Sequence, residues 1–400
     1  MREPKPITRV EISEKNKTLR IVAAVLLLVI GTLGITAGIM SLLNKETGWQ
    51  TVQLSLQERN CSENFVLQYN FAGSGAEATA VNNQLQAAYG EACVKAYQLY
   101  TPDEEIAGVN NMYYVNHNPN EIITVDPLLY QSFEKLQDTP WLYMGPVHAY
   151  YYNLILNTED ALIPEMDPMT SEVAAAYVAQ LAEFAADRNH VYLELLENNQ
   201  VRLSVSQEYL DFAAEEEIEN FLDFGYLTNA FIIDFLADVL TEKGLTNGYL
   251  ASVDGFTRNL DAAHKFSFNI FDRVDDTVYP AGVMEYRGPI SIVFLKDYAL
   301  AASDICYRAN GDHIVHMFAD PKDGIYKTSR PNLVSYSYNQ TCVDVLLNML
   351  PSFVADEATL PQGVYSVWCE DGMIFNNDEK VSFHTLLKSE QISYNAALRQ

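Results

Sequence analysis

Basic residues are scarce in this sequence. Its 400 residues include 25 Lys and Arg against 53 Asp and Glu, which gives a formal net charge of −28. Such a surface repels the phosphate backbone of DNA and RNA, so the composition excludes nucleic acid as a partner. With 48% hydrophobic and 20% charged residues, the chain is also unlike disordered or collagen-like proteins.

Several familiar motifs are missing as well. The five cysteines form no Cys-x-x-Cys pair and no Cys/His cluster with zinc spacing, which argues against a zinc site. Gly-x-Ser-x-Gly, the P-loop and Gly-x-Gly-x-x-Gly are all absent, so the usual signs of serine hydrolases, P-loop nucleotide hydrolases and dinucleotide folds are lacking. No Gly/Ser-rich or Pro-rich linker divides residues 65–385. We therefore treat them as one compact unit, preceded by a tether at 44–64 and followed by a C-terminal tail at 386–400.

One long hydrophobic run lies near the N-terminus. Residues 21–43 contain no ionisable group, and a helix of this length spans roughly 34 Å, enough to cross a hydrocarbon core of about 30 Å. The run is longer than the apolar stretch of a signal peptide and no small-residue cleavage site follows it. Residues 1–20 carry a net charge of +3, which leaves −31 for the rest of the chain. The positive-inside rule then predicts a signal anchor: a single-pass protein of the cell membrane with a cytoplasmic tail at 1–20 and an extracytoplasmic domain.

A membrane-anchored, extracytoplasmic placement affects how the cysteines and the glycines Gly34 and Gly38 are interpreted. Disulfides persist outside the cytoplasm, and because five is an odd number at least one cysteine is free or pairs with another chain. Gly34 and Gly38 form a Gly-x-x-x-Gly pattern, which is compatible with a helix dimer, although glycine is common in membrane helices in any case.

Strand and helix patterns alternate irregularly along the rest of the chain. Residues 191–205 read as a hairpin because two alternating runs flank Asn198-Asn199, and asparagine tolerates the left-handed backbone of such turns. Residues 265–272 and 288–295 read as further strands, and residues 171–188 and 229–244 as helices. The strict strand-helix-strand rhythm of a doubly wound sheet is missing, so the pattern predicts an α+β fold.

Few polar clusters suggest chemistry by themselves. The acidic run at 215–217 with Glu219 is better explained as a solvated helix face than as a metal site. His313 and His316 lie beside a predicted turn, and chance explains their spacing equally well. Asp223, Asp254, Asp320 and Asp344 are each typical of turns or helix starts, but together they are compatible with a phosphate ester whose charge a divalent metal neutralises.

The order of several segments resembles the FAD:protein FMN transferase (ApbE-like) family over about residues 95–355. The segments that carry the resemblance are TPDEEIAGVNN with VDPLLYQSFEKLQD, TPWLYMGPV, DFGYLTNAFIID, YLASVDGFTRNL, ALAASDICYRANGDHIVHMFADPKDG and TCVDVLLNML. The resemblance implies an enzyme that uses Mg²⁺ to split FAD and to transfer FMN to a threonine of an acceptor flavoprotein. It also implies a mixed fold of the FMN-transferase type.

The resemblance further implies roles for individual residues. The implied metal ligands are the backbone carbonyl of Tyr226 with Asp344 and Asn348, the last standing where the family has threonine. The implied catalytic residues are Asp344 and Asn229. The implied flavin contacts are Asp223, Pro140, Trp141, Asn229, Gly255, Ser303 and Asp320. Asn229 is thus implied in both roles.

The departures from the family pattern open a second hypothesis. The family's Lys-Gly is Asn229-Ala230 here, and its Gly-Gly is Asp254-Gly255, which puts a carboxylate where FAD needs room. Asp304 replaces a glycine, and Met317 stands where the family has histidine. The alternative is therefore a non-catalytic relative that binds flavin or protein, and a third hypothesis is a surface protein that binds no flavin at all.

Overall fold

The computed structural model describes residues 47–275, 277–300, 304, 306–385 and 394–398. The predicted membrane segment at 21–43 and Ser303 lie outside these residues. Within the described ranges, no helix combines the length and the apolar character that crossing a membrane requires. By its internal contacts the chain divides into one unit of Met1–Gly48 with Phe71–Asn83 and a second of Trp49–Asn70 with Gln84–Gln400. Apart from Gly48 and Phe71, the residues of the sheets and of the candidate site described below belong to the second unit.

A nine-stranded sheet forms the framework. Its strands, in spatial order, are β1 (Gly48–Thr51), β2 (Phe65–Phe71), β6 (Gly248–Ser252), β7 (Phe256–Asn259), β10 (Ile290–Lys296), β13 (Asn332–Ser337), β14 (Tyr365–Glu370), β15 (Met373–Asn376) and β17 (Asn395–Leu398). Neighbours from β2 to β15 pair antiparallel, whereas β15 and β17 are parallel. β10 and β13 are buried along their whole length, which is typical of central strands covered on both faces.

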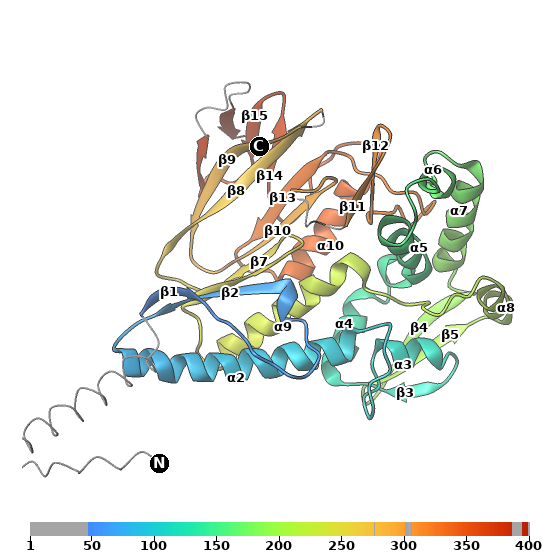
Figure 1. The fold of residues 1–400 in the computed structure, drawn as a ribbon, viewed down its shortest axis with the longest axis horizontal. Helices are drawn as coiled ribbons and strands as arrows, with labels where there is room; N and C mark the ends of the chain where they lie inside the picture. Colours follow the sequence, from blue (N-terminus) through green and yellow to red (C-terminus); the bar gives the residue numbers. More distant parts are fainter. Residues whose placement is uncertain (1–46, 276, 301–303, 305, 386–393, 399–400) are drawn as a thin grey trace, which may run out of the picture. The chain divides into compact units, whose positions relative to one another are not determined.

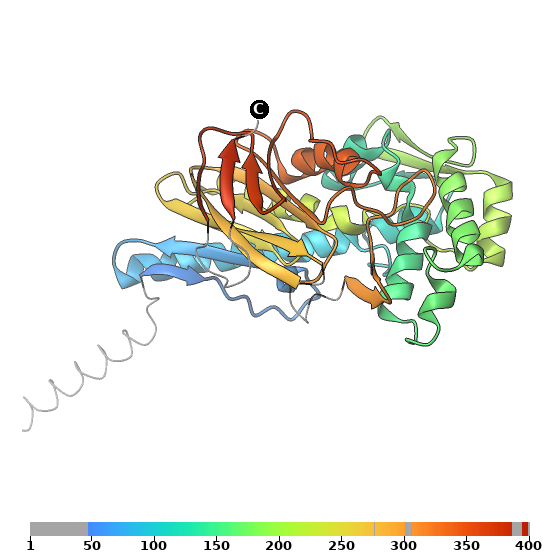
Figure 2. The ribbon, with the colours of Figure 1, turned by 90° about the horizontal axis from the view of Figure 1, so that it is seen from above.

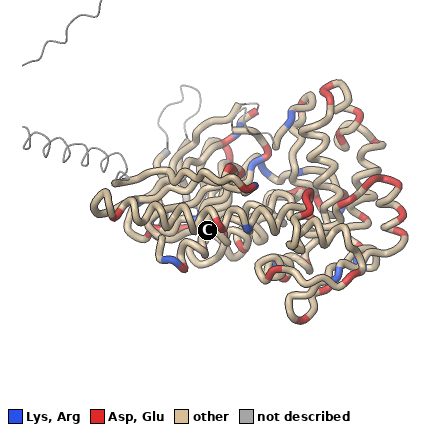
Figure 3. Tube along the Cα trace, turned by 60° about the horizontal axis from the view of Figure 1, so that its bottom comes forward, with Lys and Arg blue, Asp and Glu red and all other residues tan. Residues whose placement is uncertain are grey.

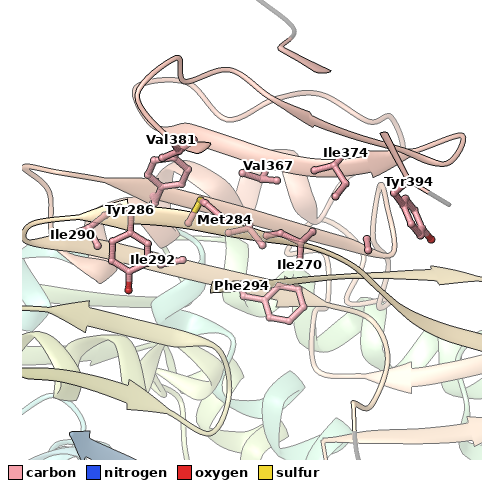
Figure 4. Close-up of a cluster of buried hydrophobic side chains, with 13 residues drawn as sticks. Ile270, Met284, Tyr286, Ile290, Ile292, Phe294, Val367, Ile374, Val381 and Tyr394 are labelled. Carbon is pink, nitrogen blue, oxygen red and sulfur yellow. The ribbon is translucent and has the colours of Figure 1, made fainter. Parts of the chain in front are cut away.

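A second sheet covers part of the first. It consists of β16 (Ser382–Thr385), β9 (Thr277–Arg287) and β8 (Lys265–Val274). Side chains of both sheets meet in one apolar cluster, in which Ile270 and Met284 from the second sheet pack with Ile292, Val367 and Ile374 from the first (Figure 4). This cluster is the main contact between the two sheets and fixes their spacing.

Two small sheets lie nearer the helices. One has the order β3 (Ile122–Thr124), β5 (Gln200–Val205), β4 (Val191–Leu196), and the other pairs β11 (Tyr307–Asn310) with β12 (His313–His316). The β4–β5 hairpin confirms the prediction for residues 191–205, since Asn198 and Asn199 both have positive φ (59° and 56°). The predicted strands at 265–272 and 288–295 are β8 and β10.

The helices are listed here with their bounds: α2 (Gly75–Tyr100), α3 (Met112–His117), α4 (Pro127–Leu136), α5 (Gly145–Leu156), α6 (Ile163–Met166), α7 (Glu172–Ala186), α8 (Gln207–Glu215), α9 (Thr228–Glu242) and α10 (Cys342–Phe353). Short 3₁₀ turns occur at η1 (Ser62–Asn64), η2 (Trp141–Tyr143) and η3 (Gly225–Leu227). α9 packs on β6 and β7, and α10 on β10 and β13 (Figure 1). Figures 1 and 2 both show α5, α6, α7 and α8 beside one another and away from β8 and β9.

Both predicted helices are present, and their ends follow the sequence signals. Ser171 caps α7 by accepting a hydrogen bond from the backbone N–H of Ala174. Gly244 follows α9 with φ of +70°, and the N–H of Leu245 closes the last turn on the carbonyl of Leu240. The α+β class is therefore confirmed.

Acidic side chains are spread over many elements and outnumber basic ones (Figure 3). Residues 215–217 end α8 and are exposed, as expected of a solvated helix end. His316 is buried in β12, and burial lowers its pKa to about 3, so it stays neutral. His313 is half-buried at the other end of the same strand.

Candidate functional site

A cleft of about 680 Å³ lies among α5, the start of α9 and the strands β10 and β11. Its size falls within the range of about 300–1,000 Å³ that is typical of small-molecule sites. The lining includes Asp103, Gly145, His148, Tyr152, Asp223, Tyr226, Asn229, Asp254, Phe256, Tyr307, Met317 and Phe318.

One hydrogen-bonded loop places the segment 220–229 against α5. The side chain of Asn116 donates to the carbonyl of Leu222 (2.8 Å) and accepts from its N–H (2.9 Å). The N–H of Asp223 bonds to the carbonyl of Leu142 (3.1 Å). Asn116 is buried, and both the nitrogen and the oxygen of its side-chain amide bind the backbone of Leu222. Together with the bond from Asp223 to Leu142, these contacts hold Asp223 in place.

Two glycines allow the close approach that this arrangement needs. A Cβ on Gly145 would lie 2.5 Å from the carbonyl oxygen of Asn220. Gly225 has φ of +52°, and a Cβ there would lie 2.4 Å from Nδ1 of His148. Larger residues at either position would push α5 away from the segment that carries Asp223.

Asp223 lines the cleft. One carboxylate oxygen accepts from the N–H of Gly225 (2.9 Å), and the other is 3.7 Å from Nδ1 of His148, whose side chain is 3% exposed. Burial, together with the nearby charge of Asp223, raises the pKa of Asp103 on the opposite loop. The two carboxylates are therefore close enough to repel each other.

Asn229 and Asp254 form a second polar contact in the cleft. The amide of Asn229 donates to Oδ2 of Asp254 (2.9 Å). Burial raises the pKa of Asp254, although the hydrogen bond from Asn229 acts in the opposite direction. The two family departures singled out from the sequence thus contact each other directly, and together they occupy one wall of the cleft.

Aromatic side chains make up much of the remaining lining. The ring of Tyr226 lies 5.0 Å from that of Phe318 and 5.5 Å from that of His148, measured between centroids. Burial raises the pKa values of Tyr226 and Tyr307 well above the ordinary value, so both phenols stay protonated. These rings offer apolar faces to a flat ligand.

Three polar atoms of this lining are buried without a hydrogen-bond partner among the described residues. They are Nδ1 of His148, the hydroxyl of Tyr226 and Oδ1 of Asp254. Buried polar groups are nearly always satisfied in folded proteins, because leaving one unpaired costs about 1–3 kcal/mol. Each of the three therefore lowers the stability of the ligand-free protein.

The predicted flavin contacts fall into two groups. Asp223 and Asn229 line the cleft, whereas Pro140, Trp141, Gly255 and Asp320 do not. Trp141 is buried behind the wall, with its ring 6.4 Å from that of Tyr226, and Pro140 precedes it at the start of η2.

Gly255 and Asp320 have clear structural roles. Gly255 has φ of +110°, and a Cβ there would lie 2.2 Å from the carbonyl oxygen of Phe294, so only glycine fits. Asp320 is buried, accepts from the N–H of Lys322 (3.0 Å) and pairs with Lys327 (3.2 Å), which holds the turn closed.

The implied metal ligands are not brought together at the cleft. Tyr226 lines it, but Asp344 and Asn348 do not, and Asn348 is exposed on α10. In Asp344, one oxygen pairs with Lys135 (2.6 Å) and the other accepts from the hydroxyl (2.8 Å) and the N–H (3.2 Å) of Thr341. Asp344 and Thr341 form a capping box at the start of α10.

The charge state of Asp344 agrees with this structural role. Burial by itself would raise its pKa, but the hydrogen bonds from Lys135 and Thr341 outweigh burial and hold the pKa below its ordinary value. No group of three or more His, Cys, Asp or Glu side chains suited to a metal ion occurs among the residues that the structure describes. In this arrangement Asp344 is engaged by Lys135 and Thr341, and neither Asp344 nor Asn348 lines the cleft.

Asp234 also belongs to the start of α10. Its two oxygens accept from the N–H groups of Cys342 and Val343 (both 2.9 Å), and Oδ1 also pairs with Arg258 (2.5 Å). It is 7% exposed. Asp234 therefore stabilises the start of α10 through these hydrogen bonds and its ion pair with Arg258.

Two residues of the site were not predicted from the sequence. Asp103 lies in an irregular loop, and His148 is one of several polar residues in an otherwise apolar helix. The Gly145-Pro146 start of α5, which the resemblance included, was the available clue that this helix packs tightly against the site.

Comparisons with known proteins bear on the fold alone. No protein-family model matches the sequence, and no curated protein matches it. A solved structure of the flavin transferase ApbE from Vibrio cholerae is similar with a TM-score of 0.52 at 11% identity, covering 85% of this chain and 97% of that one. An ApbE protein from Thermotoga maritima gives a TM-score of 0.48 at 12% identity, covering 74% of this chain and 84% of that one. The chain has the flavin-transferase fold, which confirms the resemblance first seen in the order of its segments.

Proposed function

We propose that this protein is a membrane-anchored, extracytoplasmic flavin-binding relative of the flavin transferases that has lost magnesium-dependent FMN transfer. The proposal rests on which of the implied residues line the cleft and which do not. The cleft forms at two of the implied flavin contacts, Asp223 and Asn229, and at one implied metal ligand, Tyr226, whereas the carboxylate implied for the metal, Asp344, is engaged by Lys135 and Thr341.

The lining of the cleft supports flavin as the ligand. Aromatic rings of Tyr152, Tyr226, Tyr307 and Phe318 surround the space and can pack against an isoalloxazine ring. Polar side chains of the lining, such as those of Asn153 and Asn229, can hydrogen-bond to the polar edge of such a ring. This combination of apolar walls and a few convergent polar groups is the usual design of a small-molecule site.

The contacts of Asp344 argue against metal-dependent transfer. A carboxylate ligates Mg²⁺ through free oxygen lone pairs, and here one oxygen serves Lys135 and the other serves Thr341. Asn229 meets Asp254 at the position where the family pattern has a lysine. With neither group available, the charge on a transferring phosphoryl group would go without stabilisation.

FMN transfer from FAD to an acceptor flavoprotein remains the second candidate. The side chain of Asp344 is 38% exposed and its partner Lys135 is 41% exposed, so this ion pair is open to competition from a metal ion. Under this candidate, Mg²⁺ would displace Lys135 when FAD binds.

Membrane anchoring rests on the sequence. The uncharged run at 21–43 and the basic residues before it support a single span, with the flavin cleft outside the cytoplasm. Protease treatment of intact cells tests this placement: we expect the domain to be cleaved without lysis. Protection of the domain until the cells are lysed would contradict it.

The decisive experiment separates binding from transfer. Full-length protein in detergent micelles is titrated with flavins by calorimetry, and separately incubated with FAD, Mg²⁺ and a flavoprotein acceptor, with an active flavin transferase as positive control. We expect flavin binding but no fluorescent acceptor on a denaturing gel. Labelled acceptor that disappears in Asp344→Asn would establish the second candidate instead. Absence of any flavin binding would overturn both.

A further inference from the structure

The charge of the cleft bears on which flavin it accepts. Three carboxylates line it, Asp103, Asp223 and Asp254, and none of the described lining residues is Lys or Arg. FAD and FMN both carry negatively charged phosphate. A site for them needs a positive charge or a metal ion to offset the phosphate, and the carboxylates do the opposite.

The nearest cations do not change this balance. Lys296 is 5% exposed, lies close enough to lower the pKa of Asp254, and is bound through Nζ to Asp304 (2.6 Å). Its charge is thereby matched by a carboxylate outside the cleft lining. His148 faces Asp223, so a proton on its ring would be matched in the same way.

Helix dipoles favour anions at the cleft but are too weak to reverse its charge. The first residues of α5 and α9, including Gly145 and Thr228, line the cleft. A helix N-terminus carries roughly half a positive charge, and Asp223 already uses a nearby N–H, that of Gly225. Two such ends equal about one charge, against three carboxylates.

The unpaired oxygen of Asp254 points to the chemistry of the ligand. Oδ1 of Asp254 is a buried acceptor without a donor, at the wall where Asn229 holds the other oxygen. An N–H of a neutral heterocycle would satisfy it, whereas a phosphate oxygen would be repelled by it.

From these observations, and resting on the proposed function, we infer that the cleft selects the uncharged flavin, riboflavin, over FMN and FAD. An N–H of the isoalloxazine ring donates to Asp254, and the ring packs between the aromatic side chains. The acidic lining excludes flavins that carry phosphate. The protein is then a riboflavin-binding module built on a flavin-transferase fold.

Calorimetric titration of the full-length protein in detergent micelles with riboflavin, FMN and FAD, without divalent metal, tests the inference. We expect riboflavin to bind at least about tenfold more tightly than FAD, and the gap to shrink as salt screens the carboxylates. FAD binding as tightly as riboflavin, or more tightly, would overturn the inference and leave the proposed function standing. No binding of any flavin would instead overturn the proposed function.

Variants test whether the carboxylates cause the preference for riboflavin over FAD. Asp103→Asn removes one negative charge and should strengthen FAD binding several-fold while leaving riboflavin nearly unchanged. Asp254→Ala should weaken riboflavin about tenfold, because the acceptor is lost. The matched control is Asp138→Asn, an exposed carboxylate that does not line the cleft, which should leave the riboflavin-to-FAD ratio as in the wild type. Thermal melting of each variant verifies that it is folded, and an unchanged ratio in folded Asp103→Asn would contradict the electrostatic explanation.

Discussion

Two sets of carboxylates in this protein differ in whether their oxygens have hydrogen-bond partners. At the start of α10, Asp234 and Asp344 have each oxygen bound to a backbone N–H, a hydroxyl or a cation. In the cleft, Asp103 and Asp254 have pKa values raised by burial, and Oδ1 of Asp254 has no partner among the described residues. A satisfied carboxylate stabilises the fold, whereas an unsatisfied one in a cleft reduces stability and is available to a ligand. The difference separates structural from functional aspartates that look alike in sequence.

The largest effect should come from Asp234→Ala. The change leaves Arg258, whose side chain is 16% exposed, without its hydrogen-bonded partner and removes the acceptor of the N–H groups of Cys342 and Val343. We expect the free energy of unfolding to fall by about 3–5 kcal/mol, measured by urea denaturation. The control is Glu242→Ala, an exposed carboxylate on the same helix, which should cost much less. Similar losses in the two variants would contradict the structural role given to Asp234.

Gly225→Ala tests the tight contact behind the cleft. The new methyl would meet the ring of His148 and would also sit at positive φ, so we expect a loss of about 2–3 kcal/mol and weaker flavin binding. Gly244→Ala shares the positive φ but meets no atom within 4 Å, so it should cost only about 1 kcal/mol. The difference between the two, read from denaturation curves, isolates the contact with His148. Equal losses of stability in the two variants would mean that α5 moves to make room for the methyl group at Gly225.

Asp254→Asn should act in the opposite direction. It keeps an oxygen for Asn229 but removes a buried charge, so near neutral pH we expect a gain of about 1–2 kcal/mol in the flavin-free protein. Because the folded-state pKa of Asp254 is raised, its contribution to stability is full below the ordinary Asp value and is lost as pH rises through the raised value. The gain should therefore vanish in acid. Stability curves between acidic and neutral pH that run parallel for the two proteins would refute this.

Asp344→Ala should have the smallest effect. It removes a capping box and an ion pair between partly exposed groups, together about 1 kcal/mol. Since the folded-state pKa of Asp344 is lowered, its contribution is present above the ordinary Asp value and is lost as pH falls through the lowered value. Lys135→Ala should lose only the free energy of the ion pair, because the capping box stays in place. A change in flavin affinity in Asp344→Ala would indicate that α10 does act on the cleft.

Local signals in the sequence predicted the elements well. Asn198 and Asn199 located the β4–β5 hairpin, and Lys243-Gly244 located the end of α9, because turn and cap conformations depend on a few neighbouring residues. The order of the segments was enough to predict the fold, which the similarity to the V. cholerae structure confirms. These features require no knowledge of which distant residues meet.

The site was harder to predict, because its residues come from distant parts of the chain. Asp103, His148, Asp223 and Asp254 meet only after α5 has packed against the loop that precedes α9. The resemblance named Asp223 and Asn229 correctly as neighbours of one space, but it could not show that Asp344 would be engaged by Lys135, 209 residues earlier in the chain.

The sequence by itself determined the α+β elements, the excess of negative charge and the uncharged run at 21–43, because each depends on composition or on neighbouring residues. The tertiary structure decided which carboxylates are free. An aspartate's role depends on the donors that surround it, and most of those donors are backbone N–H groups and side chains that only folding brings within 3 Å. That is why Asp344 serves as a helix cap here, and why Oδ1 of Asp254 is left without a donor among the described residues.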